Sequence, residues 1–307
     1  MTDPRRQNRR EFLVRAAQAA TAAASVPSLL QHAAAAASAP AGRWQIGCYT
    51  RPWAAWDYRV AMDDIATAGF QYLGLMTTNS TSHLVIGVGT PLDEAQKIGE
   101  EAKQRSLQII SVYGGDFPVE KSLAAGIEGL RHLIDACAAA KAKTLLLGGT
   151  GDEKLYPTYY KAVAECCDYA AAKGVGLTAK PHGGLNATGP QLRKCAELVG
   201  KRNFSIWYDA GNVFFYSDGK LNPVVDAAAL DGLVSGWCIK DFAAEPAKRV
   251  DLTPGTGRVD FQAVLGRLRK GGFTGGPLVV ETLAPGGRPH LMAEAKKARK
   301  FLEQLVV

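Results

Sequence analysis

Four apolar runs in the second half of the chain end in polar residues whose types could do chemistry. Lys180 opens a Lys-Pro-His-Gly-Gly segment, Asp209 lies in Tyr-Asp-Ala-Gly-Asn, Lys240 lies in Cys-Ile-Lys-Asp, and Glu281 closes Pro-Leu-Val-Val-Glu. Continuous runs rich in valine, isoleucine and leucine are typical of buried parallel strands. An ionisable residue at the carboxyl end of such a strand points into the mouth of a barrel. We therefore expect the chemistry of this chain at that end of the strands.

The elements that would position these residues repeat along the chain. Strand-length apolar runs fall at 44–49, 70–76, 107–113, 143–147, 175–180, 204–209, 233–240 and 277–281. Helical periodicity falls between and after them, near 58–68, 91–105, 119–141, 155–173, 188–200, 222–232, 260–270 and 290–305. Strict alternation predicts a parallel sheet. Eight such units predict an α/β fold that closes as a (β/α)8 TIM barrel, with a doubly wound open sheet as the alternative.

Several element boundaries carry capping signals. Thr90 and Pro91 predict a helix start, with the threonine as N-cap and the proline at the first helical position. Asp260 has the same predicted capping role for the helix near 260–270. Gly69 and Gly174 each follow a helix and precede a strand, where a left-handed backbone is expected.

The first forty residues are typical of an export signal. Asn8-Arg9-Arg10-Glu11-Phe12-Leu13 is a twin-arginine pattern, and an alanine-rich stretch with Ala-x-Ala candidates such as 37–39 follows it. We expect residues 1–41 to be a twin-arginine signal peptide, the protein to be periplasmic or otherwise extracytoplasmic, and residues 42–307 to form one barrel domain. An uncleaved anchor or a disordered leader is the alternative. Pro27 and nearby polar residues argue against a stable membrane span.

Charge and cysteine content exclude some classes of function. The net charge is +7, and about +4 remains once the arginine-rich leader is set aside. No basic block interleaved with aromatic residues is present, so we expect no nucleic-acid partner. The six cysteines are scattered and two are adjacent, at 166 and 167, so their spacing predicts buried thiols and no disulfide framework.

Residues 44–305 resemble the xylose isomerase-like TIM barrels, which include ketose 3-epimerases, hydroxypyruvate isomerases, inosose dehydratases and metal-dependent abasic-site endonucleases. The resemblance is strongest at 180–184, 209–212, 234–242, 254–261 and 271–281. In the sugar-active members, one divalent metal is held by Glu, Asp, His and Glu from strands five to eight, and the two glutamates exchange protons with the substrate. The resemblance places those ligands at Lys180, Asp209, Cys238 and Glu281, so the ligand set is atypical.

This departure leaves two interpretations of the cofactor. Lys180 would project an ammonium to the place of the ion, and like charges a few ångströms apart repel in a buried pocket. We therefore hypothesise that Lys180 replaces the metal between Asp209 and Glu281, with no cofactor. Alternatively, one divalent metal, Zn, Mn or Mg, binds Asp209, Glu281, His182 and Cys238. A purely structural interpretation, in which Lys180 or Lys240 forms buried ion pairs with the acids, also stays open.

The resemblance implies an isomerase or epimerase that removes a proton α to a carbonyl of a sugar or keto-sugar. Glu281 is then the expected base, Lys180 the electrophile and Asp209 its positioning partner. A neutral Lys180 acting as a second base or forming a Schiff base is an alternative. The residues expected to contact substrate are His182, Asn212, Lys240, Arg258 and Trp53, with Arg51 and Tyr113 at the same barrel face.

Two further functions stay open. The same residues could act in a lyase or hydratase on an oxidised (keto) glycoside, or the chain could be a non-catalytic carbohydrate-binding barrel. In each case the expected partner is a small carbohydrate, and an oligomer is possible.

Overall fold

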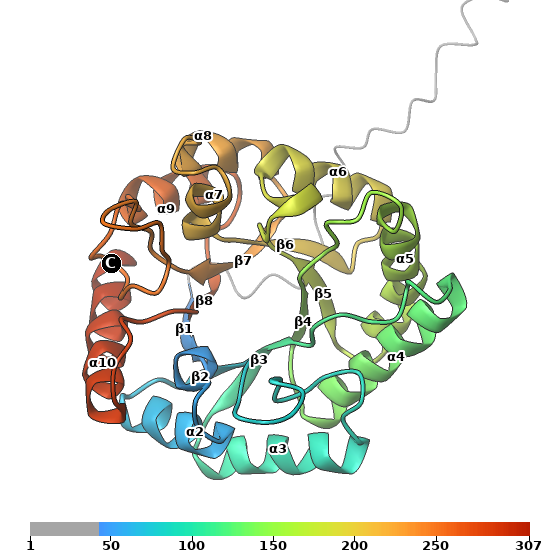
Figure 1. Cartoon of the computed structure of the whole chain (residues 1–307), viewed down its shortest axis with the longest axis horizontal. Coiled ribbons are helices and arrows are strands. Elements are labelled where there is room, and N and C mark those ends of the chain that lie inside the picture. The colour runs from blue at the N-terminus through green and yellow to red at the C-terminus, as the bar shows by residue number, and fades with distance from the viewer. Residues whose placement is uncertain (1–42) are drawn as a thin grey trace, which may run out of the picture. The chain divides into compact units, whose positions relative to one another are not determined.

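Eight parallel strands pair in chain order and close into a barrel through pairing of β8 with β1 (Figure 1). The computed structural model describes residues 43–307, so the predicted signal peptide lies outside the described residues. The strands are β1 (Trp44–Tyr49), β2 (Tyr72–Leu75), β3 (Gln108–Tyr113), β4 (Thr144–Leu147), β5 (Gly176–Ala179), β6 (Phe204–Tyr208), β7 (Val234–Ile239) and β8 (Gly276–Val280). The predicted (β/α)8 barrel is confirmed.

Helices surround the strands and cover the outside of the barrel (Figure 1). They are α2 (Tyr58–Thr67), α3 (Leu92–Gln104), α4 (Leu123–Ala139), α5 (Tyr156–Ala172), α6 (Gly189–Val199), α7 (Ala210–Tyr216), α8 (Pro223–Asp226), α9 (Phe261–Lys270) and α10 (Arg288–Leu305). Short 3₁₀ helices are η2 (Arg51–Trp53), η3 (Gly184–Asn186) and η4 (Ala227–Leu230). The helix expected at 222–232 is divided into α8 and η4, and α7 is an element that the sequence pattern did not predict.

Most of the predicted boundaries are present. Asp260 caps α9 by accepting a hydrogen bond from the Ala263 amide at 2.9 Å. Gly69 and Gly174 have φ of 91° and 72°, a left-handed backbone that favours glycine. The prediction for Thr90 was wrong, because Pro91 is the N-cap of α3 and the Thr90 hydroxyl accepts a hydrogen bond from an amide of its own loop.

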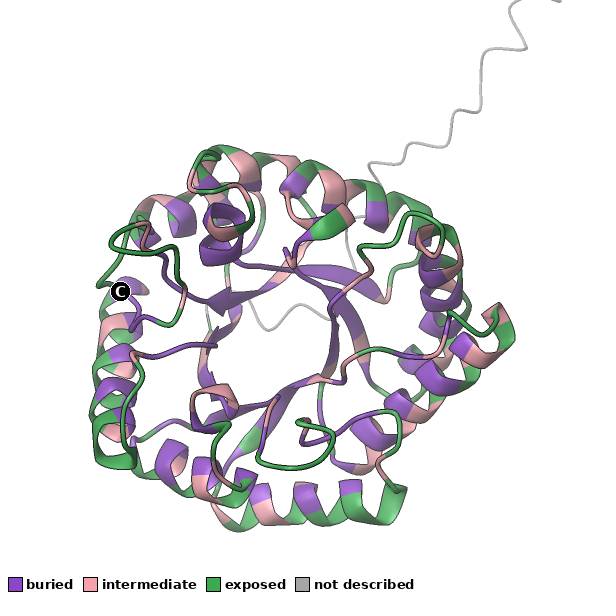
Figure 2. Ribbon diagram, in the orientation of Figure 1, coloured by how far each residue is buried: buried purple, intermediate pink, exposed green. Residues whose placement is uncertain are grey.

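Apolar side chains pack in two layers, one between strands and helices and one inside the barrel. The interior layer comprises Tyr49, Tyr72, Met76, Ile110, Leu146, Trp207, Cys238 and Val279. Two of its rings need glycine on a neighbouring strand, since a Cβ on Gly74 would lie 2.2 Å from the Tyr49 ring and one on Gly236 2.5 Å from Trp207. Figure 2 shows buried strands and helices whose outer faces are exposed. The packed interior forms a floor below the carboxyl ends of the strands.

All six cysteines are buried and unpaired, as their spacing predicted. Within the described part of the chain, no helix combines the length and apolar character needed to cross a membrane.

Candidate functional site

Five charged residues follow neighbouring strands and alternate in sign around one side of the barrel. Lys180, Asp209, Lys240 and Glu281 are the first residues after β5, β6, β7 and β8, and Arg51 is the second residue after β1. We call these five the charge ring. Because the strands are parallel and in sequence order, their carboxyl ends bring the five side chains together. The two lysines and two acids are at most 2% exposed.

Glu281 is the centre of the ring. Its Oε2 accepts a hydrogen bond from the Lys180 amine, and its Oε1 lies 2.6 Å from the Lys240 amine. The same Oε1 accepts a hydrogen bond from Nη1 of Arg51. One carboxylate therefore holds three cationic side chains.

Asp209 holds the two lysines from the other side. Its Oδ1 caps α7 by accepting a hydrogen bond from the Asn212 amide at 2.9 Å. Its Oδ2 lies 3.4 Å from the Lys240 amine and 3.6 Å from the Lys180 amine, and makes no hydrogen bond among residues 43–307. The N-terminus of α7 thus fixes Oδ1 of Asp209, while Oδ2 faces the amines of Lys180 and Lys240.

The charges of the ring shift the pKa values of Glu281 and Lys180 toward their ionised forms. Burial raises the pKa of the Glu281 carboxyl, but Lys180, Lys240 and Arg51 outweigh it and hold that pKa well below its ordinary value. Burial lowers the pKa of Lys180, and the nearby Glu281 is the main charge that outweighs it and raises that pKa. These two groups therefore form a stable ion pair.

Lys240 and Asp209 are shifted in the opposite sense. Burial lowers the pKa of Lys240 despite the two acids, and burial raises the pKa of Asp209 despite the two lysines. Both shifts lie toward the neutral forms, because burial penalises a charge. The ring therefore combines Lys180 and Glu281, whose charged forms are favoured, with Lys240 and Asp209, whose pKa values are shifted toward the neutral forms.

Asn212 positions Lys240. Its Oδ1 accepts a hydrogen bond from the Lys240 amine at 3.0 Å, and its Nδ2 donates to the Pro181 carbonyl at 2.7 Å. The residue is 3% exposed. Both polar atoms of the Asn212 side chain are bonded within the chain, so Asn212 supports the ring, and its expected substrate contact stays a prediction.

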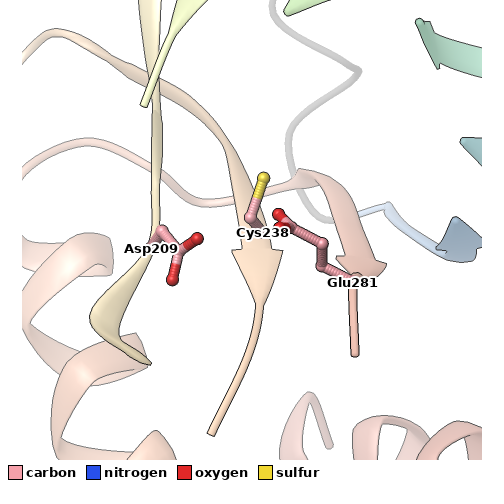
Figure 3. Close-up of side chains that lie close together, drawn as sticks. All are labelled: Asp209, Cys238 and Glu281. Carbon is pink, nitrogen blue, oxygen red and sulfur yellow. The ribbon is translucent and has the colours of Figure 1, made fainter. Parts of the chain in front are cut away.

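Cys238 lies between the two acids on β7, with both carboxylates turned toward its thiol (Figure 3). Asp209, Cys238 and Glu281 each place one potential ligand atom within 4.8 Å of the others, which is a spacing that could hold a metal. Burial raises the pKa of the Cys238 thiol well above its ordinary value, so this residue is a neutral thiol here. His182 does not belong to this group among the described residues, so the expected four-ligand set is not assembled.

His182 lies beside the ring between two tyrosines. Its ring centroid is 5.9 Å from that of Tyr113 and 6.4 Å from that of Tyr216. A Cβ on Gly148 would lie 3.0 Å from the Tyr113 hydroxyl and 3.3 Å from Nδ1 of His182, so glycine leaves room for both. Burial, followed by the positive charge of Lys180, lowers the pKa of His182 to about 4. His182 is therefore a neutral hydrogen-bonding group at physiological pH.

Two expected substrate contacts lie apart from the ring. The Trp53 indole is fully buried and donates a hydrogen bond to Asp64 at 2.9 Å, so it packs in the layer between barrel and helices. The Arg258 guanidinium stacks on Phe214, 4.8 Å from the ring centroid, and contacts the Gly219 carbonyl. In these positions Trp53 anchors η2 and Arg258 covers α7, and a substrate contact of either residue stays a prediction.

Residues 62–305 match the family described as the xylose isomerase-like TIM barrel, and the chain belongs to this family. A xylose isomerase domain protein from Planctomyces limnophilus has a TM-score of 0.65 at 18% identity, over 87% of this chain and 98% of that chain. A D-psicose 3-epimerase from Clostridium cellulolyticum H10 has 0.65 at 15% identity, over 85% and 99%. A D-allulose 3-epimerase from Methylomonas sp. has 0.64 at 16% identity, over 87% and 98%. At such identities the likeness establishes the fold. No curated protein matches the chain.

Proposed function

We propose that this chain is a carbohydrate-active enzyme of the isomerase or epimerase type, which removes a proton α to a carbonyl of a sugar or keto-sugar. Membership of the family and the names of two similar structures support this reaction class. The observation that carries the proposal is the buried set of two amines and two carboxylates at the carboxyl ends of β5 to β8. Enolisation needs a proton acceptor and an electrophile for the developing oxyanion, and this set offers both.

We also propose that the Lys180 amine supplies the positive charge that a divalent ion supplies in the sugar-active relatives. An ion bound to Asp209 and Glu281 would lie a few ångströms from both amines. Unit charges of one sign 4 Å apart repel by about 4 kcal/mol at an effective dielectric constant of 20, and a divalent ion doubles this for each amine. The residues present therefore do not fit a metal while both lysines are protonated.

Within this proposal, Lys180 is the electrophile. Its raised pKa keeps the amine charged, and its partner Glu281 holds it in place. A substrate carbonyl oxygen that accepts a hydrogen bond from the Lys180 amine gains negative charge as the neighbouring C–H bond breaks. A fixed ammonium stabilises that charge without reorganisation at the moment of reaction.

The proton acceptor in this proposal is Lys240 instead of Glu281. Three cations lower the pKa of Glu281, which makes its carboxylate a weak base. The Lys240 amine has a lowered pKa and can pass its own proton toward Oδ2 of Asp209, 3.4 Å away. The neutral amine then takes the substrate proton. Return of that proton to the former carbonyl carbon, together with transfer of the adjacent hydroxyl proton to the former carbonyl oxygen, completes an isomerisation, and its return to the opposite face of the original carbon completes an epimerisation.

The test is solvent deuterium exchange into a panel of ketoses and keto-sugars. The wild-type chain is expected to introduce deuterium at the carbon next to the carbonyl, and K240M and K180M to lose at least a hundredfold in rate. K201M is the matched control, because Lys201 pairs with Asp168 on the surface. Absence of exchange across the panel would indicate a carbohydrate-binding barrel, and loss of a β-substituent without exchange product would indicate the lyase.

Metal dependence is tested separately on the purified protein. We expect less than one tenth of a metal ion per chain by elemental analysis, and unchanged exchange rates after treatment with a chelator. A stoichiometric metal whose removal abolishes exchange would contradict the assignment of the lysines. K180E, which restores a carboxylate at the family's ligand position, is expected to bind a divalent ion more tightly than the wild type.

Export is proposed from the sequence of residues 1–41 alone. Replacement of Arg9 and Arg10 by lysine is expected to retain the chain in the cytoplasm, which cell fractionation measures. Equal export of the variant and the wild type would contradict a twin-arginine signal.

A further inference from the structure

The charge ring has an excess of positive charge. Among residues 43–307, Arg51, Lys180 and Lys240 form ion pairs within the ring with two acids, Asp209 and Glu281. The Arg51 side chain is 38% exposed, whereas the lysines and acids are at most 2% exposed. The unbalanced charge is therefore presented to solvent through Arg51.

Arg51 is held in place but keeps free donors. Its Nη1 donates to Glu281, and no other nitrogen of its guanidinium has a partner among residues 43–307. It begins η2, which Trp53 anchors through a hydrogen bond to buried Asp64. Asp64 is itself paired with Arg288. A guanidinium with one edge bonded and the other edge free has the geometry to bind a carboxylate.

Three further polar side chains beside the ring keep free donors and acceptors. Tyr113, His182 and Tyr216 make no side-chain hydrogen bond among the described residues, and burial raises the pKa values of both tyrosines. After burial, the charge of Lys180 is the next cause of the lowered pKa of His182; Glu281 opposes it, and Lys240 and Arg51 act in the same direction as Lys180.

We propose that the ligand of this site is an acidic sugar whose carboxylate binds the free edge of the Arg51 guanidinium. The sugar hydroxyls then face the polar atoms of Tyr113, His182 and Tyr216. One excess positive charge matches a singly charged carboxylate, whereas a phosphate ester carries close to two negative charges at pH 7. This inference depends on the proposed function in one respect, that the ligand is a sugar.

The test compares sugars that differ only in charge. Calorimetric titration of the full chain uses D-glucuronate against D-glucose and D-gluconate against D-glucitol, with D-glucose 6-phosphate as a third arm. We expect each acid to bind at least tenfold more tightly than its neutral counterpart, because a hydrogen bond to a charged group typically contributes that much or more. R51Q is expected to remove this preference and R51K to restore part of it. R105Q is the control, since Arg105 pairs with Asp63 on the surface.

Each outcome decides a separate point. Equal affinity for acids and neutral sugars, or a preference that survives in R51Q, would overturn the inference. Tighter binding of the phosphate than of either carboxylate would overturn the choice of carboxylate. Selective binding of acids with no deuterium exchange would leave this inference standing and remove the proposed enolisation. Deuterium exchange into neutral ketoses without preferential binding of acids would remove this inference and leave the proposed enolisation standing.

Discussion

Replacement of Glu281 by glutamine tests the charge ring most directly, because this carboxylate pairs with three cations. In E281Q, Asp209 would be the one acid among the described residues that still pairs with Lys180 and Lys240, and Arg51 would lose its ion pair. The glutamine side chain has nearly the same volume, so no cavity forms. E281Q therefore tests the effect of the carboxylate charge without a change in packing.

We expect E281Q to lower the free energy of unfolding strongly, although the side chain keeps its shape. Removal of one partner from a buried ion pair costs about 3–5 kcal/mol, since the remaining charge stays buried without compensation. For a domain of this size about 2 °C of melting temperature corresponds to 1 kcal/mol, so the midpoint is expected to fall by about 6–10 °C. The neutral amide also removes the group that holds the Lys180 amine in place.

A double-mutant cycle separates charge from shape. K180M in the E281Q background removes one excess cation and restores the formal charge balance of the wild-type ring. We expect the double variant to recover about 1–3 kcal/mol relative to the sum of the two single losses. Urea denaturation followed by circular dichroism measures all four free energies of unfolding. D168N, which breaks the exposed pair with Lys201, is the control and is expected to leave the midpoint unchanged.

The pH dependence of the free energy of unfolding tests the contribution of the Glu281 charge independently. The folded pKa of Glu281 is lowered, so its contribution to stability is present above the unfolded pKa of about 4.3 and is lost as pH falls toward the folded value. The difference in unfolding free energy between wild type and E281Q is therefore expected to shrink below about pH 4.5. An E281Q variant within 1 kcal/mol of wild type at pH 7, or strictly additive losses in the cycle, would refute the ring as a coupled unit.

Two further predictions concern the residues around the ring. Because burial and Lys180 lower the pKa of His182 to about 4, its ring is expected to stay neutral above about pH 5, and K180M to raise that pKa. NMR titration measures both, and a midpoint near 6.5 in the wild type would contradict the buried position. G236A is expected to destabilise by at least about 1–3 kcal/mol, since the new Cβ would lie 2.5 Å from the Trp207 ring. G266A in α9 has nothing within 4 Å and is expected to stabilise by up to about 1 kcal/mol.

The barrel could be predicted because its signals are local. Every observed strand overlaps an apolar run, and each run is followed by glycine, proline or polar residues. The helix α7 was missed because Ala210–Tyr216 is only seven residues long and follows β6 directly, without a separate loop. Its N-cap is Asp209, so a residue predicted for its chemistry also has a structural task.

The site could be predicted only in part, because side-chain direction is not local. Lys180, Asp209 and Glu281 meet as predicted, since the first residue after a barrel strand projects into the mouth. Arg51 and Trp53 follow β1 together, yet in a 3₁₀ helix residues two positions apart project in different directions. The sequence therefore could not decide which of them reaches the ring. The structure selects Arg51.

A lysine at one of the ligand positions that the resemblance implies changes the charge of the site and, in our proposal, its cofactor. Three carboxylates around one divalent ion, the set that the resemblance describes, leave one negative charge. The five ring residues of this chain leave one positive charge. Two buried acids need compensating cations, and Lys180 and Lys240 supply them from two sides of Glu281. In our proposal, the Lys180 amine stabilises the oxyanion, and the excess charge of the ring favours an acidic ligand. The same substitution therefore links the proposed loss of metal dependence to the proposed change of substrate class.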